Sequence, residues 1–184
     1  MSLPPSSGIG SRHSSEVENL ITRTAKILLV AVIALFYTLV VFNNLTDFGS
    51  NYQFVQHVLA MDTTMPGNHG MWRALPYPAA YYTFYWSIIA WEIVTTFLLW
   101  WGVAALTRAR SKAPVEFNAA KRIPVVALTL SLLMWLLAFH TVGGEWFLMW
   151  QSRIWNGQED SFRNFVEVAL VLIFLTRPET ETQP

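Results

Sequence analysis

The segment ILLVAVIALFYTLVVF, from Ile27 to Phe42, contains no charged side chain. With a few flanking residues it reaches the roughly 20 residues that cross the hydrocarbon core of a bilayer as a helix. Within lipid, every backbone N–H and C=O group must be bonded inside the chain, so a single span has to be helical. Composition extends this conclusion, because 53% of the 184 residues are hydrophobic and only 13% are charged. The sequence therefore predicts an all-α integral membrane protein.

Two further segments have the same character. The run from Tyr81 to Leu106 carries a single charged residue, Glu92, and is long enough to cross with some tilt. The run 123–142 begins with Pro124, which a first helical turn tolerates, and Gly143-Gly144 follows its end.

A fourth span has the weakest pattern, because its purely apolar part from Val168 to Leu175 is too short to cross alone. This helix must begin near Asp160 or Ser161 as its N-cap and carry Arg163 and Glu167 inside. We therefore expect a four-transmembrane-helix bundle with spans at about 24–45, 80–106, 123–142 and 160–176.

The basic residues divide unevenly between the two sides that four spans create. Of the 12, only Arg73, Arg153 and Arg163 fall on the side away from the termini. Because Lys and Arg collect on the cytoplasmic side, both termini are predicted to be cytoplasmic. The membrane domain then covers 21–178, between a disordered tail at 1–20, rich in Ser, Pro and Gly, and a tail at 179–184. The outer, periplasmic segments are 46–79 and 143–159.

Four stretches carry a resemblance to a known family. They are NNLTDFGSNYQFVQHVLAMDTTMPGN (43–68), MWRALPYP (71–78), YWSIIAWE (85–92) and GGEWFLMWQSRIWNGQEDSFR (143–163). Together they resemble a bacterial family of predicted small four-helix integral membrane proteins of unknown function. The resemblance covers most of the chain except both tails. It implies the four-span layout and a bacterial inner membrane, and it implies no activity for any residue.

The outer segments are rich in aromatic residues at helical spacing, which is typical of short helices in the membrane interface. We expect segments 51–73 and 143–163 to pack together as a cap over the outer helix ends. Glu145 should pair with Arg73, Arg153 or Arg163, because an unpaired carboxylate at that depth is costly. The candidate cap residues are His57, Asp62, Arg73, Glu145, Trp146, Trp150, Arg153 and Arg163.

Polar residues within the spans form a second set of candidates: Glu92, Glu167, Tyr37 and Ser131. Glu92 near mid-bilayer must be protonated or partnered. It is either a neutral group bonded to hydroxyls of other helices, or a group that handles protons. Glu167 follows Arg163 by four residues, which predicts an ion pair on one helix face.

Several classes of function are disfavoured. The formal net charge is zero, so nothing in the sequence indicates a nucleic-acid partner. Cys is absent, which excludes thiolate metal sites and cysteine nucleophiles. His57, His69 and His140 lack the spacing of paired metal ligands, so no cofactor is predicted, although quinone or haem remain alternatives. No catalytic motif is present, which favours a protein that is not an enzyme.

The sequence thus predicts an accessory or scaffold subunit of a larger bacterial inner-membrane assembly. Its partners would be the lipid bilayer and either other subunits or further copies of the chain. One alternative is a redox or quinone-interacting membrane module with a Met-rich aromatic pocket on the outer side. A second alternative is a small transporter in which Glu92 is the proton-coupling residue.

Overall fold

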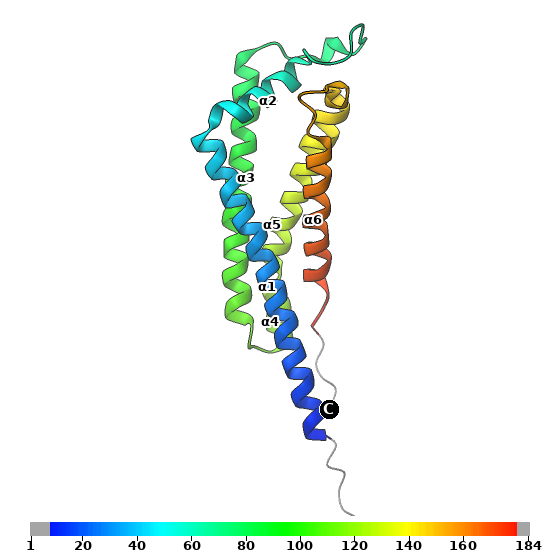
Figure 1. Cartoon of the computed structure of the whole chain (residues 1–184). Helices are drawn as coiled ribbons and strands as arrows, with labels where there is room; N and C mark the ends of the chain where they lie inside the picture. Colours follow the sequence, from blue (N-terminus) through cyan, green and yellow to red (C-terminus); the bar gives the residue numbers. More distant parts are fainter. Residues whose placement is uncertain (1–7, 180–184) are drawn as a thin grey trace, which may run out of the picture.

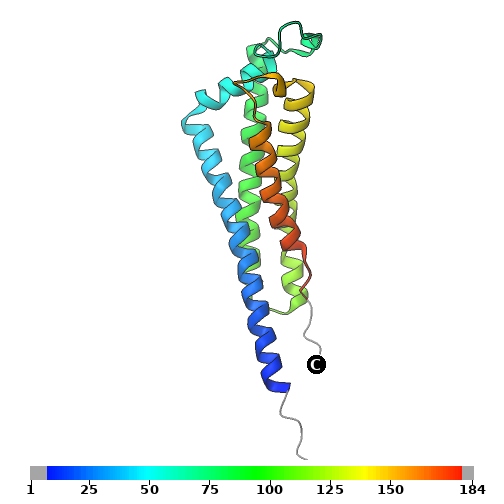
Figure 2. The same cartoon turned by 45° about the vertical axis from the view of Figure 1, so that its right-hand side comes forward.

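The computed structural model describes residues 8–179, and within them every regular element is a helix. The long helices run side by side (Figure 1), as the turned view also shows (Figure 2). They are α1 (Gly8–Thr46), α3 (Pro78–Ala109), α5 (Arg122–Leu133), which continues as η2 (Met134–Trp146), and α6 (Gln158–Thr176). The short elements are α2 (Phe48–Ala60), η1 (Met71–Arg73), α4 (Pro114–Ala120) and η3 (Met149–Gln151). We call the two ends of the bundle the α2 end and the α4 end.

Three helical segments are long and apolar enough to cross a membrane: Val17–Thr46, Pro78–Ala109 and Pro114–Trp146. They coincide with the first three expected spans. The residues of the fourth expected span are also helical, as α6, and they pack along α5 and η2. α6 is not one of these three segments, because its 19 residues include four charged ones, Glu159, Asp160, Arg163 and Glu167.

Two helix boundaries differ from the expected ones. Residues 8–20, which we expected to be disordered, continue α1 toward the N-terminus, because extending an existing helix adds one hydrogen bond for each residue fixed. α6 begins at Gln158 after Gly157, two residues before the expected N-cap. Glu159 and Asp160 then lie in its first turn, where carboxylates interact favourably with the helix dipole. Residues 1–7 and 180–184 of the expected tails lie outside the described residues.

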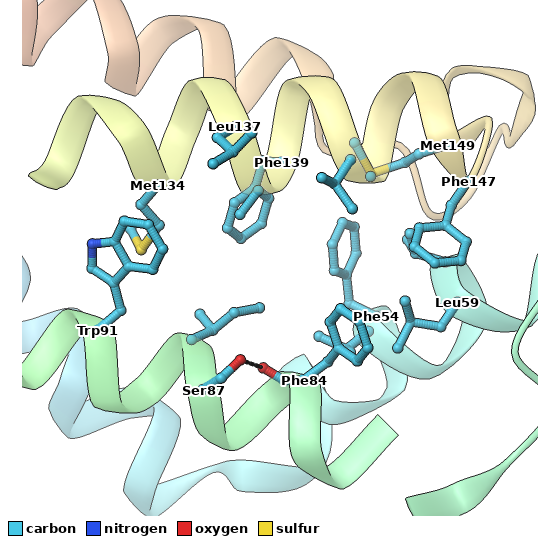
Figure 3. A pocket seen from close by; sticks show the side chains of 16 residues that line it. Phe54, Leu59, Phe84, Ser87, Trp91, Met134, Leu137, Phe139, Phe147 and Met149 are labelled. Atoms are coloured by element: carbon cyan, nitrogen blue, oxygen red, sulfur yellow. Dashed lines mark hydrogen bonds between the residues drawn. The ribbon is translucent and has the colours of Figure 1, made fainter. Parts of the chain in front are cut away.

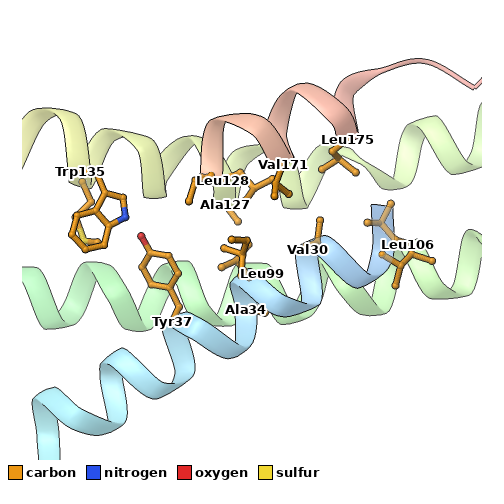
Figure 4. Close-up of a cluster of buried hydrophobic side chains, with 14 of the residues drawn as sticks. Val30, Ala34, Tyr37, Leu99, Leu106, Ala127, Leu128, Trp135, Val171 and Leu175 are labelled. Atoms are coloured by element: carbon orange, nitrogen blue, oxygen red, sulfur yellow. The ribbon is translucent and has the colours of Figure 1, made fainter. Parts of the chain in front are cut away.

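The half of the bundle toward the α4 end has a continuous apolar core (Figure 4). Its buried side chains come from all the long helices and include Val30, Ala34, Leu99, Leu106, Ala127, Leu128, Val171 and Leu175. α3 and α5 approach closely at Gly102, where an added Cβ would lie 2.7 Å from the Pro124 Cβ. Because a larger residue at position 102 would clash with Pro124, only glycine permits this close packing of α3 on α5.

The third span does not end at Val142 as expected, because the chain winds on as a π-helix through Trp146. The i→i+5 pattern appears in the bond from the Phe147 N–H to the Val142 carbonyl, at 3.0 Å, and in the Thr141 hydroxyl bond to the Leu136 carbonyl, at 2.8 Å. π-helical turns are rare and are frequent at functional sites. α3 packs closely on α5 but not on η2, so the helices separate toward the α2 end.

Candidate functional site

The separation of α3 from η2 leaves a cavity of about 240 Å³, which α2 covers (Figure 3). Aromatic and sulfur-containing side chains form most of its wall, among them Phe54, Phe84, Trp91, Met134, Phe139, Phe147 and Met149. Phe84 and Leu137 line it and are 39% and 47% exposed, so the cavity is open on the side between α3 and η2. We call this space the apolar cavity.

Glu92 lies on α3 beside this cavity and is only 3% exposed. Its Oε2 accepts a hydrogen bond from the Asn44 side-chain amide, at 2.6 Å. The Asn44 Oδ1 accepts from the Asn51 amide at 2.5 Å and from the Tyr85 hydroxyl at 3.2 Å. Asn44 therefore joins α1, α2 and α3, and the side chains in this network other than Glu92 are all neutral.

Glu92 and Asn44 line a second cavity of about 160 Å³, which we call the polar cavity. Its other lining residues are Val40, Asn51, Phe54, Val55, Tyr85, Ile88, Trp135 and Phe139. Four of them, Phe54, Val55, Ile88 and Phe139, also line the apolar cavity. The two cavities are thus neighbours that share a wall.

Trp135, which lines the polar cavity, carries a buried donor without a partner within residues 8–179. The indole N–H of Trp135 is buried and has no hydrogen-bond partner among the described residues. It points toward the Tyr37 hydroxyl (Figure 4), but the geometry is not that of a hydrogen bond. Tyr37 and Ser131, which we expected as partners of Glu92, instead bond to each other through their hydroxyls at 2.6 Å.

The two segments expected to form a cap lie against each other at the α2 end. The Thr63 and Ser152 hydroxyls share a hydrogen bond at 2.8 Å, and the Met65 N–H donates to the Gln151 side chain at 3.2 Å. These bonds join the loop after α2 to the loop before α6.

Aromatic rings add to this contact. The Trp72 and Trp146 rings meet edge to face with centroids 5.8 Å apart. The His57 ring stacks on Trp155 at 4.7 Å, and its Nδ1 lies 2.8 Å from an Asp62 carboxylate oxygen. The cap therefore rests on aromatic packing and on hydrogen bonds.

The ion pair expected for Glu145 does not form among residues 8–179. Arg73 instead donates to the main-chain carbonyls of Glu145 and Trp146, at 3.3 and 3.1 Å. The Glu145 side chain is exposed, so it needs no cationic partner. Trp150 and Arg153 are exposed as well, at the same end of the bundle.

The expected pair of Arg163 with Glu167 is also absent from the described residues. Arg163 bonds to Asp160, one turn earlier on α6, at 2.7 Å. Asp160 lies at the helix start with an exposed side chain, so the arginine reaches it without desolvation. Glu167 is left exposed on the outside of α6.

A second buried carboxylate, at the α4 end, was not foreseen from the sequence. Glu179 follows α6 and binds three cations, with nitrogen–oxygen distances of 3.5 Å to Arg23, 2.5 Å to Lys26 and 3.2 Å to Lys121. The cations also donate to main-chain carbonyls of residues 110, 112 and 177. Burial alone would raise the pKa of the Glu179 carboxyl, but hydrogen bonds and charges from Lys26 and Lys121 outweigh it and lower that pKa.

Residues 8–179 contain no group of three or more His, Asp or Glu side chains that could hold a metal ion, and the chain has no Cys. Comparison with known proteins gives one match. The model of a family described as predicted small integral membrane protein (DUF2165) matches residues 22–178. No curated protein and no solved structure is significantly similar to the chain.

Proposed function

We propose that the chain, which belongs to this family of predicted small integral membrane proteins, is an accessory or scaffold subunit of a larger membrane assembly. In this proposal α6 is the fourth span, both termini are cytoplasmic, and the membrane is a bacterial inner membrane. The exposed face of α6 is the surface that meets the partner subunit.

Length and charge support the layout. α6 has 19 residues, about 28 Å of helix at 1.5 Å per residue, close to the ~30 Å of the hydrocarbon core. Basic residues gather at the α4 end, which is the pattern of a cytoplasmic side. Arg12 lies on the N-terminal part of α1, and the other basic residues on this side are Arg23, Lys26, Arg108, Arg110, Lys112, Lys121, Arg122 and Arg177.

The observation that carries the accessory role is the exposed position of Glu167 near the middle of α6. Its side chain has no ion pair or hydrogen bond within residues 8–179. If α6 crosses the membrane, lipid would surround this carboxyl, at a cost of several kcal/mol. A polar group on a helix of another subunit would remove that cost. Leu170 and Ile173, both exposed, extend this side of α6 toward the α4 end.

The layout is tested with reporter fusions. A reporter joined after Pro184 should be active in the cytoplasm, and one inserted at Gly67, an exposed turn residue with nothing near its Cβ position, should behave as periplasmic. A periplasmic C-terminus would remove α6 as a span.

The partner surface is tested by photo-crosslinking in cells. A crosslinking amino acid at Leu170, 61% exposed beside Glu167, should give one discrete protein adduct. The same amino acid at Leu39, 53% exposed on α1, is the matched control and should give none. The Leu170 adduct should disappear in Glu167→Leu, which keeps the bulk and removes the polar group. Equal adducts at both positions would contradict the proposal, and an adduct of two 21.0 kDa chains would identify the partner as a second copy.

The two alternatives differ in their support. The redox or quinone-interacting module is supported by the aromatic, Met-containing apolar cavity near Glu92. A transporter needs a polar route along the bundle, but the apolar core separates Glu92 from the α4 end within the described residues.

A further inference from the structure

Glu92 is a buried carboxyl whose charge nothing nearby balances. Its hydrogen-bond partner is the neutral amide of Asn44, and none of the ion pairs within residues 8–179 includes it. Of its two carboxyl oxygens, only Oε2 has a side-chain partner within residues 8–179, and Glu92 lines the polar cavity, where a ligand could supply another. A buried carboxyl without a cation is stable in its neutral, protonated form, and a bound cation would allow it to ionise. The site is therefore incomplete on the cation side.

Aromatic rings surround the same cavity. Phe54, Tyr85, Trp135 and Phe139 line it together with Glu92, and they come from α2, α3 and η2. The faces of such rings carry negative potential and attract an organic cation within about 6 Å. A metal ion would need several free oxygen ligands, but Glu92 is the one carboxyl among the described residues of this wall and the Asn44 Oδ1 already accepts two hydrogen bonds. One carboxylate among aromatic rings suits an alkylammonium group.

The apolar cavity lies next to the polar cavity. The stacked rings of Phe54 and Phe139, with centroids 6.3 Å apart, belong to both walls. A ligand that occupies both cavities has to pass between these two rings, and it needs a cationic head and an uncharged, apolar body. The exposed rim at Phe84 and Leu137 allows such a molecule to enter sideways between α3 and η2.

We propose that the two cavities form one binding site for an amphipathic organic cation. Its ammonium group lies beside Glu92 among the aromatic rings, and its apolar body fills the space between α2, α3 and η2. This site is separate from the exposed face of α6, so it can be present whether or not the accessory role is correct.

An isosteric pair of probes isolates the charge. Phenyltrimethylammonium and tert-butylbenzene have nearly the same shape, and only the first is a cation. Binding is measured by titration calorimetry on the full chain in nanodiscs of neutral phosphatidylcholine, with empty nanodiscs subtracted. Wild-type protein should bind the cation at least about tenfold more tightly than the hydrocarbon.

Two variants locate the effect. Glu92→Gln keeps the shape and the bond with Asn44, so it should weaken the cation at least about tenfold and leave the hydrocarbon unchanged. Glu167→Gln is the matched control on the exposed face of α6 and should change neither affinity. If Glu92→Gln does not fold, Phe139→Leu replaces it, with a smaller loss expected for the cation alone.

Three outcomes would overturn the proposal. Equal or tighter binding of tert-butylbenzene would mean that the site takes neutral molecules, such as a quinone. An unchanged cation affinity in Glu92→Gln would place the cation elsewhere. Binding of neither probe would mean that the cavities are packing defects. Because the chain is measured alone, each outcome is independent of the crosslinking result at Leu170.

Discussion

Glu92 and Glu179 are both buried carboxyls, but they have opposite surroundings. Glu179, at the α4 end, binds Arg23, Lys26 and Lys121. Glu92, toward the α2 end, bonds to a single neutral amide and lines a cavity. The fold satisfies one carboxyl completely and leaves the other open.

Packing around the two carboxyls differs in the same way. Toward the α4 end, α3 and α5 touch backbone to side chain at Gly102, and apolar side chains fill the bundle. Toward the α2 end, α3 separates from the π-helix η2, and two cavities lie beside the gap. Removing one partner from a buried ionic cluster destabilises a fold, whereas a carboxyl that lines a cavity without a cation is available to a ligand.

The largest expected effect is on Glu179. Glu179→Gln leaves three buried cations without their counter-charge, so the free energy of unfolding in detergent should fall by about 3 kcal/mol. Glu116→Gln is the control, because the exposed Glu116–Lys112 pair at the same end should contribute under about 1 kcal/mol. Thermal or denaturant unfolding measures both. Equal effects would show that the Glu179 cluster is not a structural centre.

Gly102→Ala should come next. The new Cβ would meet the Pro124 ring at 2.7 Å, and separating α3 from α5 should cost about 2 kcal/mol. Gly49→Ala is the matched control, since a Cβ there meets nothing within 4 Å. The same unfolding experiment measures both variants. If Gly102→Ala left the free energy of unfolding unchanged, the packing at the α4 end would be as adaptable as that at the α2 end, and the contrast between the two ends would be wrong.

Changes at Glu92 should be milder. Glu92→Gln keeps the hydrogen bonds and should leave the unfolding free energy within about 0.5 kcal/mol of wild type. Glu92→Ala removes the partner of Asn44 and should cost about 1 to 2 kcal/mol. The measurement is the same unfolding experiment. A strongly destabilised Glu92→Gln would make this carboxyl as structural as Glu179.

The smallest effect is the pH dependence of the Glu179 cluster. The pKa of Glu179 lies below its usual 4.5, so its stabilisation is complete above about pH 4.5 and is lost as the pH falls through the folded-state value. The stability difference between wild type and Glu179→Gln should therefore begin to shrink as the pH falls below about 4.5. A difference that grew on acidification would contradict the lowered pKa.

Features set by local sequence were predictable. Uninterrupted apolar runs identified α1, α3 and the α5–η2 helix, because a span is determined by some 20 consecutive residues. The aromatic spacing around Trp146 indicated the cap region. By contrast, Glu145 was assigned a partner because a sequence does not reveal that its side chain is exposed.

Long-range pairings were out of reach for a physical reason. Glu179 lies 153 residues from Lys26, and Asn44 lies 48 residues from Glu92, so no periodic pattern connects them. Asn44 follows an apolar run as one of two adjacent Asn residues, and an amide at a helix end is the only hint it offered. The π-helix has no hydropathy signature, and the cavities arise only from how α3 and η2 diverge.

The close contact of Gly102 with Pro124 is a fixed point about which the α5–η2 helix would tilt relative to α3. From residue 124 to Phe139 the helix rises roughly 22 Å, so a tilt of about 8° about the contact widens the gap beside η2 by about 3 Å. That is close to the thickness of one aromatic ring. A wider ligand would then be accommodated by a rigid-body tilt of the α5–η2 helix, while the apolar core toward the α4 end keeps its packing.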